Sequence, residues 1–505
     1  MMPTTLLLLA PIALPLFTAI AFGVLGWRRV MTGLALLLSA TLVVAVGLLA
    51  ARLSTAGPIS TAGGLIRADA LTGWILLVIA AVSLLATWAS PAYLNAGGAI
   101  RRRSRWYGML LNLFVAAMAI AVLSGNLGII WVAIEATTIV TAFLVGHDGT
   151  RTALEAAWKY VLICSAAIAV AFLGLVLLYF AARQAGLEGP TALDWTVLSR
   201  HADQLDPTVT RIAVGLLVLG FGAKAGLIPL HAWLPDAHSQ APAPVSAMMS
   251  GVLLSVAFTT VLRFKTIADG ALGPAFLRAL LLTIALITLA VAAILLIGQR
   301  DYKRMLAYSS MEHMGLIALG AAVGTELAIA AVLLHMAGHG LAKSVAFLGS
   351  GHIMHRHGST AVDAVRGLAV TAPALAVTFG LAVAALLGFP PAAVFASEIG
   401  IARAGADAGL GWAVALGFLL ALLAFAAIAA QIGRMLLGVP GGVADQHSGP
   451  PGTQPMATVS HGSTKLGVGV AAPLAVGLLA VAALGVSTGP LNSLLQQAAS
   501  IIGVP

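Results

Sequence analysis

The sequence is poor in charged residues and in cysteine. Asp, Glu, Lys and Arg make up only 9% of its 505 residues, whereas a soluble domain has about 25%, so the composition excludes a soluble protein. The single cysteine, Cys164, excludes an intramolecular disulfide and an iron–sulfur cluster held by this chain alone. We therefore expect no cofactor in this chain and assign any redox chemistry to partner proteins.

Apolar stretches fill the chain instead. Apolar residues make up 60% of it and 55 residues are glycine, which suits close helix packing in lipid. Runs of about 20 apolar residues, the length that crosses a bilayer, recur throughout, and the first lacks the basic start of a secretory signal. The sequence predicts an all-α polytopic membrane protein with about fourteen helices. They are expected at 5–26, 31–51, 70–89, 107–124, 127–146, 158–181, 211–232, 245–264, 276–297, 303–322, 327–352, 372–402, 410–432 and 467–487.

The basic residues indicate an orientation in the membrane and give no support for nucleic-acid binding. The net charge is +9, but Lys and Arg lie mainly in short loops between the apolar runs, where they signal topology. Loops after odd-numbered helices carry more of them than loops after even-numbered helices. The positive-inside rule then predicts a multi-pass protein of the cell membrane with both termini outside the cytoplasm.

One apolar run, Leu219–Ser250, carries a lysine and then a break. Lys224 lies near its middle, and Pro229 removes a backbone hydrogen bond and kinks the helix. A lysine at the bilayer centre costs roughly 2.5–3.5 kcal/mol, so a retained one forms a pair, lines a wet cavity or moves charge. Glu135, mid-helix in WVAIEATTIV, is its expected partner, because an opposite charge favours the ionised carboxylate. A static, structural ion pair is the alternative.

The segment Ala384–Ala402 repeats this pattern. Pro390 and Pro391 interrupt it, and Glu398 is its buried charge. Two interrupted helices, five helices apart, indicate an internal repeat with a site at each break. We therefore divide the chain into N-terminal helices at 1–106, a first five-helix repeat at 107–264, a second, inverted repeat at 276–432, a flexible cytoplasmic loop at 433–466 and a C-terminal helix at 467–505.

Three titratable residues share one face of the expected helix 327–352. His335, His339 and Lys343 recur every fourth residue and form a stripe about 12 Å long. Such a stripe suits proton hopping, because the pKa of histidine lies near neutrality, and Glu398 is expected to end it. Core histidines bonded to carbonyl groups are the alternative. A metal site is less expected, since HMAGH lacks the glutamate of zinc peptidases.

Weaker candidates surround these residues. Asp236 either caps a helix or takes part in transport. Lys159, at the start of a helix, either extends its amine to the membrane surface or belongs to a proton uptake path. The pair at 312 and 313 either joins the stripe or faces a loop. The auxiliary candidates are Lys159, His231, Asp236, His238, Glu312 and His313.

Five motifs together resemble the antiporter-like membrane subunits shared by respiratory complex I, membrane-bound nickel–iron hydrogenases and Mrp-type cation/proton antiporters. The motifs are WVAIEATT, AKAGLIPLHAWLPDAHSQAPAPVSA, DYKRMLAYSS, HMAGHGLAKS and FPPAAVFASE. They cover the fourth to the thirteenth expected helix. Within this family, EATT, EAAWKYVLICS and LPDAHSQAPAPVSAMMSGVLL look most like component F of hydrogenase-4 and formate-hydrogenlyase complexes.

The resemblance implies fourteen helices, two inverted five-helix repeats and a hydrated polar axis along the membrane midplane. It also implies a role for each candidate. Glu135 and Lys224 form the pair of the first half-channel, His335, His339 and Lys343 the link, and Glu398 the terminal group of the second half-channel. Many relatives have histidine where Ser250 stands, which leaves the bridge between half-channels to water or another group. Some have lysine in place of Glu398, which leaves the direction of proton exit open.

The expected function is therefore ion translocation, with H⁺ as the expected ion and Na⁺ as the alternative. The resemblance implies other membrane subunits and a peripheral redox arm as partners, with Fe–S and Ni–Fe or flavin groups only in those partners. Two other functions remain open. One is a redox-independent Na⁺/H⁺ antiporter or a subunit of an inorganic-carbon uptake complex. The other is a structural or quinone-site scaffold whose buried charges move no ions.

Overall fold

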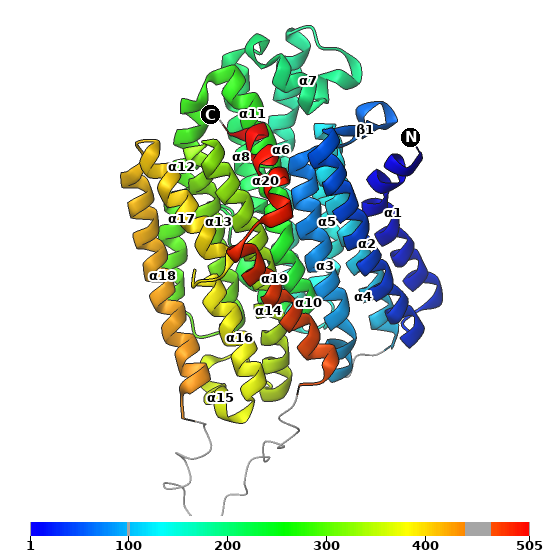
Figure 1. The fold of residues 1–505 in the computed structure, drawn as a ribbon, viewed down its shortest axis with the longest axis vertical. Helices are drawn as coiled ribbons and strands as arrows, with labels where there is room; N and C mark the ends of the chain where they lie inside the picture. Colours follow the sequence, from blue (N-terminus) through cyan, green and yellow to red (C-terminus); the bar gives the residue numbers. More distant parts are fainter. Residues whose placement is uncertain (1, 98–100, 440–465, 504–505) are drawn as a thin grey trace, which may run out of the picture.

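Long helices dominate the molecule. The computed structural model describes residues 2–97, 101–439 and 466–503. The helices run side by side along its longest axis, and a two-stranded sheet lies at one end (Figure 1). Within the described ranges, twelve helices are long and apolar enough to cross a membrane, judged by length and composition. The prediction of an all-α polytopic membrane protein is confirmed.

The N-terminal part contains three long helices and a small hairpin. Strand β1 pairs antiparallel with β2, and Ser60 lies opposite Arg67. Asp69 caps the next helix by accepting a hydrogen bond from the Thr72 backbone N–H. The elements are α1 (Met2–Leu25), α2 (Arg29–Ala56), β1 (Ile59–Thr61), β2 (Ile66–Ala68) and α3 (Ala70–Ala96).

A block of five packed helical segments follows, and its fourth segment is broken. Side chains of Asn126, Thr150 and Asp206 cap three of the helices. The elements are α4 (Arg101–Leu123), α5 (Leu127–Val145), α6 (Arg151–Gln184), η2 (Gly189–Leu193), α7 (Trp195–Arg200), η3 (Ala202–Gln204), α8 (Pro207–Lys224), α9 (Trp233–Gln240), α10 (Ala243–Met248), the π-helical segment η4 (Met249–Leu253) and α11 (Leu254–Leu272).

The next block repeats this order, again with a broken fourth segment. Asp301 caps one of its helices and Thr325 caps the next. The elements are α12 (Pro274–Ile297), α13 (Tyr302–Val323), α14 (Glu326–His357), η5 (Val362–Ala364), α15 (Leu368–Thr371), α16 (Pro373–Leu386), α17 (Ala393–Asp407) and α18 (Gly411–Leu437). That the two blocks are inverted repeats stays a prediction.

The chain closes with α19 (Val468–Val486), η7 (Gly489–Leu491) and α20 (Asn492–Ile502). We call the end of the molecule where α1 begins and α20 ends the terminal face (Figure 1). The opposite end, which carries the connections at 146–150, 298–301 and 358–367, is the loop face. Most of the predicted cytoplasmic loop, at 440–465, lies outside the described residues.

Two of the predicted spans are not among the twelve apolar helices. The first is α13, which has the length of a span but carries Lys303, Arg304 and Glu312 and is almost wholly buried. The second is the broken pair α16 and α17, neither of which is long enough to cross alone. The count of fourteen therefore stays a prediction, and it depends on whether these two segments are counted.

The breaks in the two blocks have the same local cause. After α8, Gly226 takes a left-handed conformation at φ 82°, and after α16 Gly388 does so at φ 68°. Prolines 229, 390 and 391 follow, and a proline cannot donate the backbone hydrogen bond that would continue the helix. Each break therefore leaves the end of a half-helix inside the protein, where free carbonyl groups favour a cation.

Helix α14 lies at the centre of the bundle. Nearly all of its residues are buried, whereas most residues of α18 and α19 are exposed or only partly buried. A close approach of two glycines lets η4 pack against it, because a Cβ on Gly251 would lie 2.7 Å from the carbonyl oxygen of Gly340. The π-helical segment and α14 thus meet backbone to backbone where the two blocks join.

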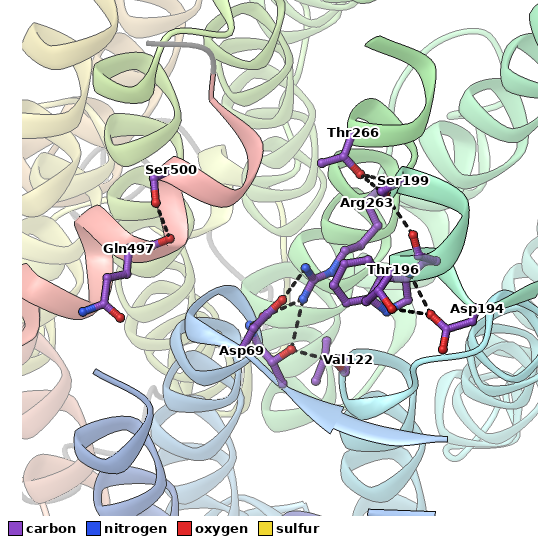
Figure 2. A network of polar contacts seen from close by, with 11 residues as sticks. Asp69, Val122, Asp194, Thr196, Ser199, Arg263, Thr266, Gln497 and Ser500 are labelled. Carbon is purple, nitrogen blue, oxygen red and sulfur yellow. Dashed lines mark hydrogen bonds and ion pairs between the residues drawn. The ribbon is translucent and has the colours of Figure 1, made fainter. Parts of the chain in front are cut away.

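A buried ion pair holds the terminal face together. Arg263 of α11 donates to both carboxylate oxygens of Asp69, at 2.6 and 2.7 Å, and to Thr72 Oγ1 at 3.1 Å (Figure 2). Its guanidinium also lies 4.0 Å from the ring centroid of Trp195. Burial alone raises the pKa of the Asp69 carboxyl, but the charge and hydrogen bonds of Arg263 outweigh it and hold the pKa below its usual value of 3.8.

We expect Asp69→Ala to destabilise the protein by about 3–5 kcal/mol, because it leaves the buried Arg263 without a counter-charge. The midpoint of thermal unfolding of the purified protein in detergent measures the loss. Glu188→Ala is the control, since its exposed pair with Arg183, at 3.7 Å, is worth about 1 kcal/mol or less.

The pKa of the Asp69 carboxyl is lower in the folded protein than in the unfolded one. Its ionised form therefore stabilises the fold at pH values above the unfolded pKa, and this stabilisation is lost as the pH falls through the folded pKa. Acidification below about pH 4 should therefore narrow the gap between wild type and Asp69→Ala. Equal midpoints for the two variants at neutral pH would contradict this account.

Candidate functional site

Lys224 is the last residue of α8 and is fully buried. Its Nζ donates to Thr138 Oγ1 at 2.8 Å and to Tyr160 Oη at 2.5 Å. It also lies 4.5 Å from the centroid of the Tyr160 ring. Hydroxyl groups, an aromatic face and the carbonyl end of α8 all favour an ammonium group here. The break thus creates the surroundings that a lysine needs inside a membrane.

Glu135 reaches Lys224 through a hydroxyl group. It lies in α5 and is half-buried, and its Oε1 accepts from Ser165 Oγ at 2.7 Å. Its Oε2 accepts from Thr138 Oγ1 at 3.2 Å, and Lys224 donates to the same Thr138 oxygen. No direct ion pair joins Glu135 to Lys224 in the part of the chain that the structure describes. Thr138 is therefore positioned to relay a proton between the expected partners.

The auxiliary residues near the first break separate into two groups. The Asp236 carboxylate accepts from Lys159 Nζ at 3.2 Å and also pairs with Arg304 of α13. Lys159 has a second partner, Glu155, at 2.6 Å. These charges link α6, α9 and α13 on the loop-face side of the break. His231 stands apart from them, with its Nδ1 3.3 Å from the Pro229 carbonyl oxygen.

In the second block, His313 of α13 occupies the centre of a histidine cluster. Its Nδ1 lies 3.1 Å from His335 Nε2, and its ring centroid lies 4.9 Å from that of His339. Its Nε2 lies 3.7 Å from a carboxylate oxygen of Glu312. The stripe predicted on α14 therefore continues through α13. His313 connects two histidines of the stripe to a carboxyl group.

The hydrogen bonds around His335 select its tautomer. Ser397 Oγ donates to the Val394 carbonyl oxygen at 2.6 Å and must accept from His335 Nδ1, 2.9 Å away. His335 Nε2 is then the acceptor, and it receives the proton on His313 Nδ1. In this neutral state His313 Nε2 is free to accept a proton from the side of Glu312. The arrangement is ready to pass a proton from one ring to the next.

Two buried histidines have no hydrogen-bond partner. Both ring nitrogens of His339, and both of His238 on α9, are buried and unpartnered within the described residues. The ring centroid of His238 lies 5.8 Å from Trp233 and 5.8 Å from Phe347. Across residues 2–97, 101–439 and 466–503, no group of three or more His, Cys, Asp or Glu side chains could hold a metal ion.

Lys343 is fully buried one turn beyond His339 on α14. Its Nζ donates to the Leu306 carbonyl oxygen at 2.6 Å and to Ser309 Oγ. Ser310, which bonds to the same carbonyl oxygen at 3.0 Å, also forms a 2.6 Å hydrogen bond with Ser250 of η4. The hydroxyl of Ser250 thus bonds to the polar groups around Lys343.

Glu312 and Glu398 line one cavity of 190 Å³, together with Leu386, Leu387, Phe418, Ala421, Leu422 and Phe425. Glu398 forms no hydrogen bond or ion pair within the described residues, and Glu312 has only its 3.7 Å contact with His313. The carbonyl end of α16 adjoins the cavity. Two carboxyl groups without donors, beside a helix end that favours cations, form a site for protons or another small cation.

Gly388 is required where it approaches Glu398. A Cβ at this position would collide with the Glu398 carboxylate, and the backbone is left-handed at φ 68°. We expect Gly388→Ala to displace the carboxylate and lower ion flux by about tenfold. The control is Gly409→Ala, which has a similar φ of 72° and no atom within 4 Å of the added carbon. Flux in membrane vesicles, per assembled protein, measures the effect, and equal flux in the two variants would contradict it.

The structure adds residues that the sequence analysis did not single out. Thr138 and Tyr160 solvate Lys224, Ser309 solvates Lys343, and Ser397 orients His335. One of them had a sequence signal, because Thr138 lies one turn after Glu135 and so shares its helix face. The others come from different helices, and spacing along the chain gives no information about them.

Taken together, these groups are buried and half-buried titratable residues, with the Thr138 hydroxyl between two of them, that are distributed across both helical blocks. We call this set the polar line. Its members are Glu135, Thr138, Lys224, Lys343, His339, His313, His335, Glu312 and Glu398. Two broken helices with acids, lysines and histidines near the breaks make the polar line a candidate site for moving an ion across a membrane.

The family follows from sequence comparison. A profile of the transmembrane NADH:quinone oxidoreductase/Mrp antiporter family matches residues 124–424, more than half of the chain. The chain belongs to this family. It is 40% identical over 296 residues to a hydrogenase-4 component F homologue of Methylacidiphilum infernorum, a match that covers 58% of this chain and 62% of that relative. The chain thus spans less than two thirds of that relative's length.

Solved structures show the same fold. One is a chain of the membrane-bound sulfane sulfur reductase, an archaeal respiratory membrane complex, with a TM-score of 0.84 and 24% identity over 99% of this chain and 98% of that one. Another is a chain of the Mrp complex from Dietzia, with a TM-score of 0.84, 22% identity and the same coverage. At these identities the likeness establishes the fold alone.

Proposed function

We propose that this protein is the proton-translocating membrane subunit of a multi-subunit oxidoreductase of the hydrogenase-4 or complex I type. The polar line carries this proposal, because intramembrane titratable groups are costly and are kept mainly where charge moves. The hydrogenase-4 component F homologue and the multi-subunit complexes among the similar structures support a role as one subunit among several. Fe–S and Ni–Fe or flavin groups then belong to the partner subunits.

The contacts support a mechanism in which charge drives the proton. A charge change in a neighbouring subunit draws Glu135 away from Thr138, and Lys224 loses the carboxylate that stabilises its ammonium form. Lys224 then releases its proton along the polar line towards the α14 histidines. At the far end, Glu312 and Glu398 accept the proton in their shared cavity and release it.

The orientation belongs to the same proposal. Arg28, Arg151, Arg300 and Arg366 lie at the loop face, whereas fewer basic residues lie at the terminal face. By the positive-inside rule, the loop face is cytoplasmic and both termini lie outside in the cell membrane. Labelling of single cysteines introduced near Gly358, at the loop face, and at the exposed Glu188, at the terminal face, in intact cells tests this assignment. Labelling of position 358 from outside would reverse it.

A redox-independent Na⁺/H⁺ antiporter is the second candidate. The cavity favours it, since two carboxyl groups without hydrogen-bond donors beside a helix end suit Na⁺ as well as a proton. The fold of the Mrp complex chain is compatible with this function. Antiport activity moves Na⁺ and H⁺ without any electron donor, which separates the two candidates.

Purification of the tagged protein from its native membrane in mild detergent tests the proposed function. Mass spectrometry should then identify a nickel–iron-hydrogenase-like large subunit and iron–sulfur proteins in stoichiometric amounts. Recovery of small membrane subunits alone, or of a soluble zinc-enzyme-like partner, would contradict redox coupling. Ion flux without a redox substrate would then be the next measurement.

A further inference from the structure

Lys303 is a buried amine that the polar line does not include. It is the second residue of α13, at the loop face, and its side chain is 1% exposed. Its Nζ donates to the Ala241 carbonyl oxygen at 3.1 Å, which is its one hydrogen bond within the described residues. An ammonium group has further N–H donors, and these have no protein acceptor. The amine therefore needs water or a proton acceptor nearby.

His238 lies on the side of Lys303 that faces the interior. It is three residues before Ala241 and fully buried, with both ring nitrogens unpartnered. The ring of His238 lies 5.8 Å from that of Phe347, which is one turn beyond Lys343 on α14, and His238 is near enough to Lys303, Lys343 and His339 for their charges to interact. His339, whose nitrogens are likewise unpartnered, is a member of the polar line. Three titratable side chains thus follow one another from the loop face to the centre of the bundle.

Buried polar groups are nearly always hydrogen-bonded, to protein or to ordered water. Two buried imidazoles and a buried ammonium that lack protein partners therefore indicate water between them. Asp236, Lys159 and Arg304, also on the loop-face side, are ion-paired with one another. Ser250 is bonded to Ser310. His355, whose Nε2 is also buried and unpartnered, and the carboxylates of Asp148 and Asp301 interact with Lys303. Among the described residues, Lys303 and His238 are the groups without an ion pair that lead from there towards His339.

We propose that Lys303 and His238, joined by ordered water, form a side branch that delivers protons from the loop face to His339. This inference rests on the proposed function, because a branch has meaning only if the polar line carries protons. It gives the line a point of proton uptake at His339, beyond Lys224 and Lys343. The second half can then be reloaded without returning a proton through Lys224.

Each transfer in the branch moves one proton and leaves the net charge unchanged. The Lys303 ammonium gives a proton through water to one ring nitrogen of His238. The imidazolium gives up the proton on its other nitrogen, through water, to His339. The Lys303 amine then takes a proton from water at the loop face and is an ammonium group again, while His238 is left as its other neutral tautomer and is reset by rotation of its ring.

Substitutions at Lys303 separate a relay from a structural role. Lys303→Met removes the amine, and Lys303→Arg keeps the charge and the hydrogen bond but cannot release a proton. His238→Gln keeps hydrogen-bonding capacity without titration. We expect each variant to lower proton translocation by at least about tenfold. The control is Lys265→Met, which removes another buried lysine, paired with Asp269 near the terminal face, and should leave translocation unchanged.

Translocation is measured on the complete complex in inverted membrane vesicles and is normalised to assembled protein. Lys224→Met, in the same experiment, separates this inference from the proposed function. If Lys224→Met stops translocation while Lys303→Arg or His238→Gln translocates normally, the branch is wrong. If Lys224→Met also translocates normally, the proposed function itself fails. Should Lys303→Met not assemble, the arginine and glutamine variants still decide the question.

Discussion

Lys224→Met is expected to stop proton translocation while the protein still assembles in the membrane. The substitution removes the ammonium group whose proton starts the relay, and with it the donors to Thr138 and Tyr160. Methionine fills much of the same volume without a charge, so the loss of the buried ammonium does not leave a large cavity. We expect the rate to fall to the background of membranes without the protein, at least about a hundredfold.

The measurement is dye-reported acidification of inverted vesicles, with the amount of assembled protein followed by an affinity tag. Tyr160→Phe is an informative companion, because it removes one of the two acceptors of Lys224 and keeps the lysine. It should slow translocation without stopping it. Normal acidification by assembled Lys224→Met would disprove the role assigned to this residue.

Lys343→Met is expected to have the second-largest effect. Lys343 is the one lysine of the α14 stripe, and its amine donates hydrogen bonds to the Leu306 carbonyl oxygen and to the Ser309 hydroxyl. Without it, the second block lacks the amine that accepts the proton released by Lys224 in the first block. Translocation should fall at least about thirtyfold.

Lys343→Arg distinguishes transport from packing at this position. The guanidinium keeps a positive charge but does not release its proton, so it should transport as poorly as methionine. Ser309→Ala, which removes one acceptor and leaves the other, is the milder companion and should retain most activity. Full activity in Lys343→Arg would show that this position requires only a positive charge.

The two breaks and their charged residues were predictable from local chemistry. Proline cannot continue a helix, and a charge beside it in an apolar run is conspicuous. Lys224 and Glu398 therefore emerged from the sequence, and the structure places each of them beside a half-helix end. The stripe on α14 followed from helical spacing alone. These features depend on neighbours in the chain, which is why they can be recognised in one sequence.

Contacts between helices were not predictable in the same way. Glu135 was expected to be the partner of Lys224, but the part played by Thr138 between them was not predictable, because the axial offset between α5 and α8 cannot be derived from either helix alone. The place of His313 between His335 and His339 depends on how α13 packs on α14. The burial of Lys303 likewise reflects neighbouring segments and not its own polar motif.

The burial of α13 could not be predicted from the polar composition of its first half. DYKRMLAYSS resembles a surface segment in composition, yet α13 is nearly as buried as α14. Its polar groups have partners in other segments, as Lys303 has at Ala241, between α9 and α10, and Ser310 has at Ser250 of η4. A segment that is polar all round is buried only when its neighbours supply hydrogen bonds. That requirement cannot be read from hydropathy.

The most direct test of the central claim is the ratio of protons translocated to electrons transferred, measured on the purified complex in proteoliposomes. The wild type and the double variant Lys224→Met with Lys343→Met are compared, each in the presence and in the absence of Na⁺. The account predicts that the wild type acidifies the vesicle interior independently of Na⁺ and that the double variant contributes no protons through this subunit. An unchanged proton-to-electron ratio in the double variant would contradict the account.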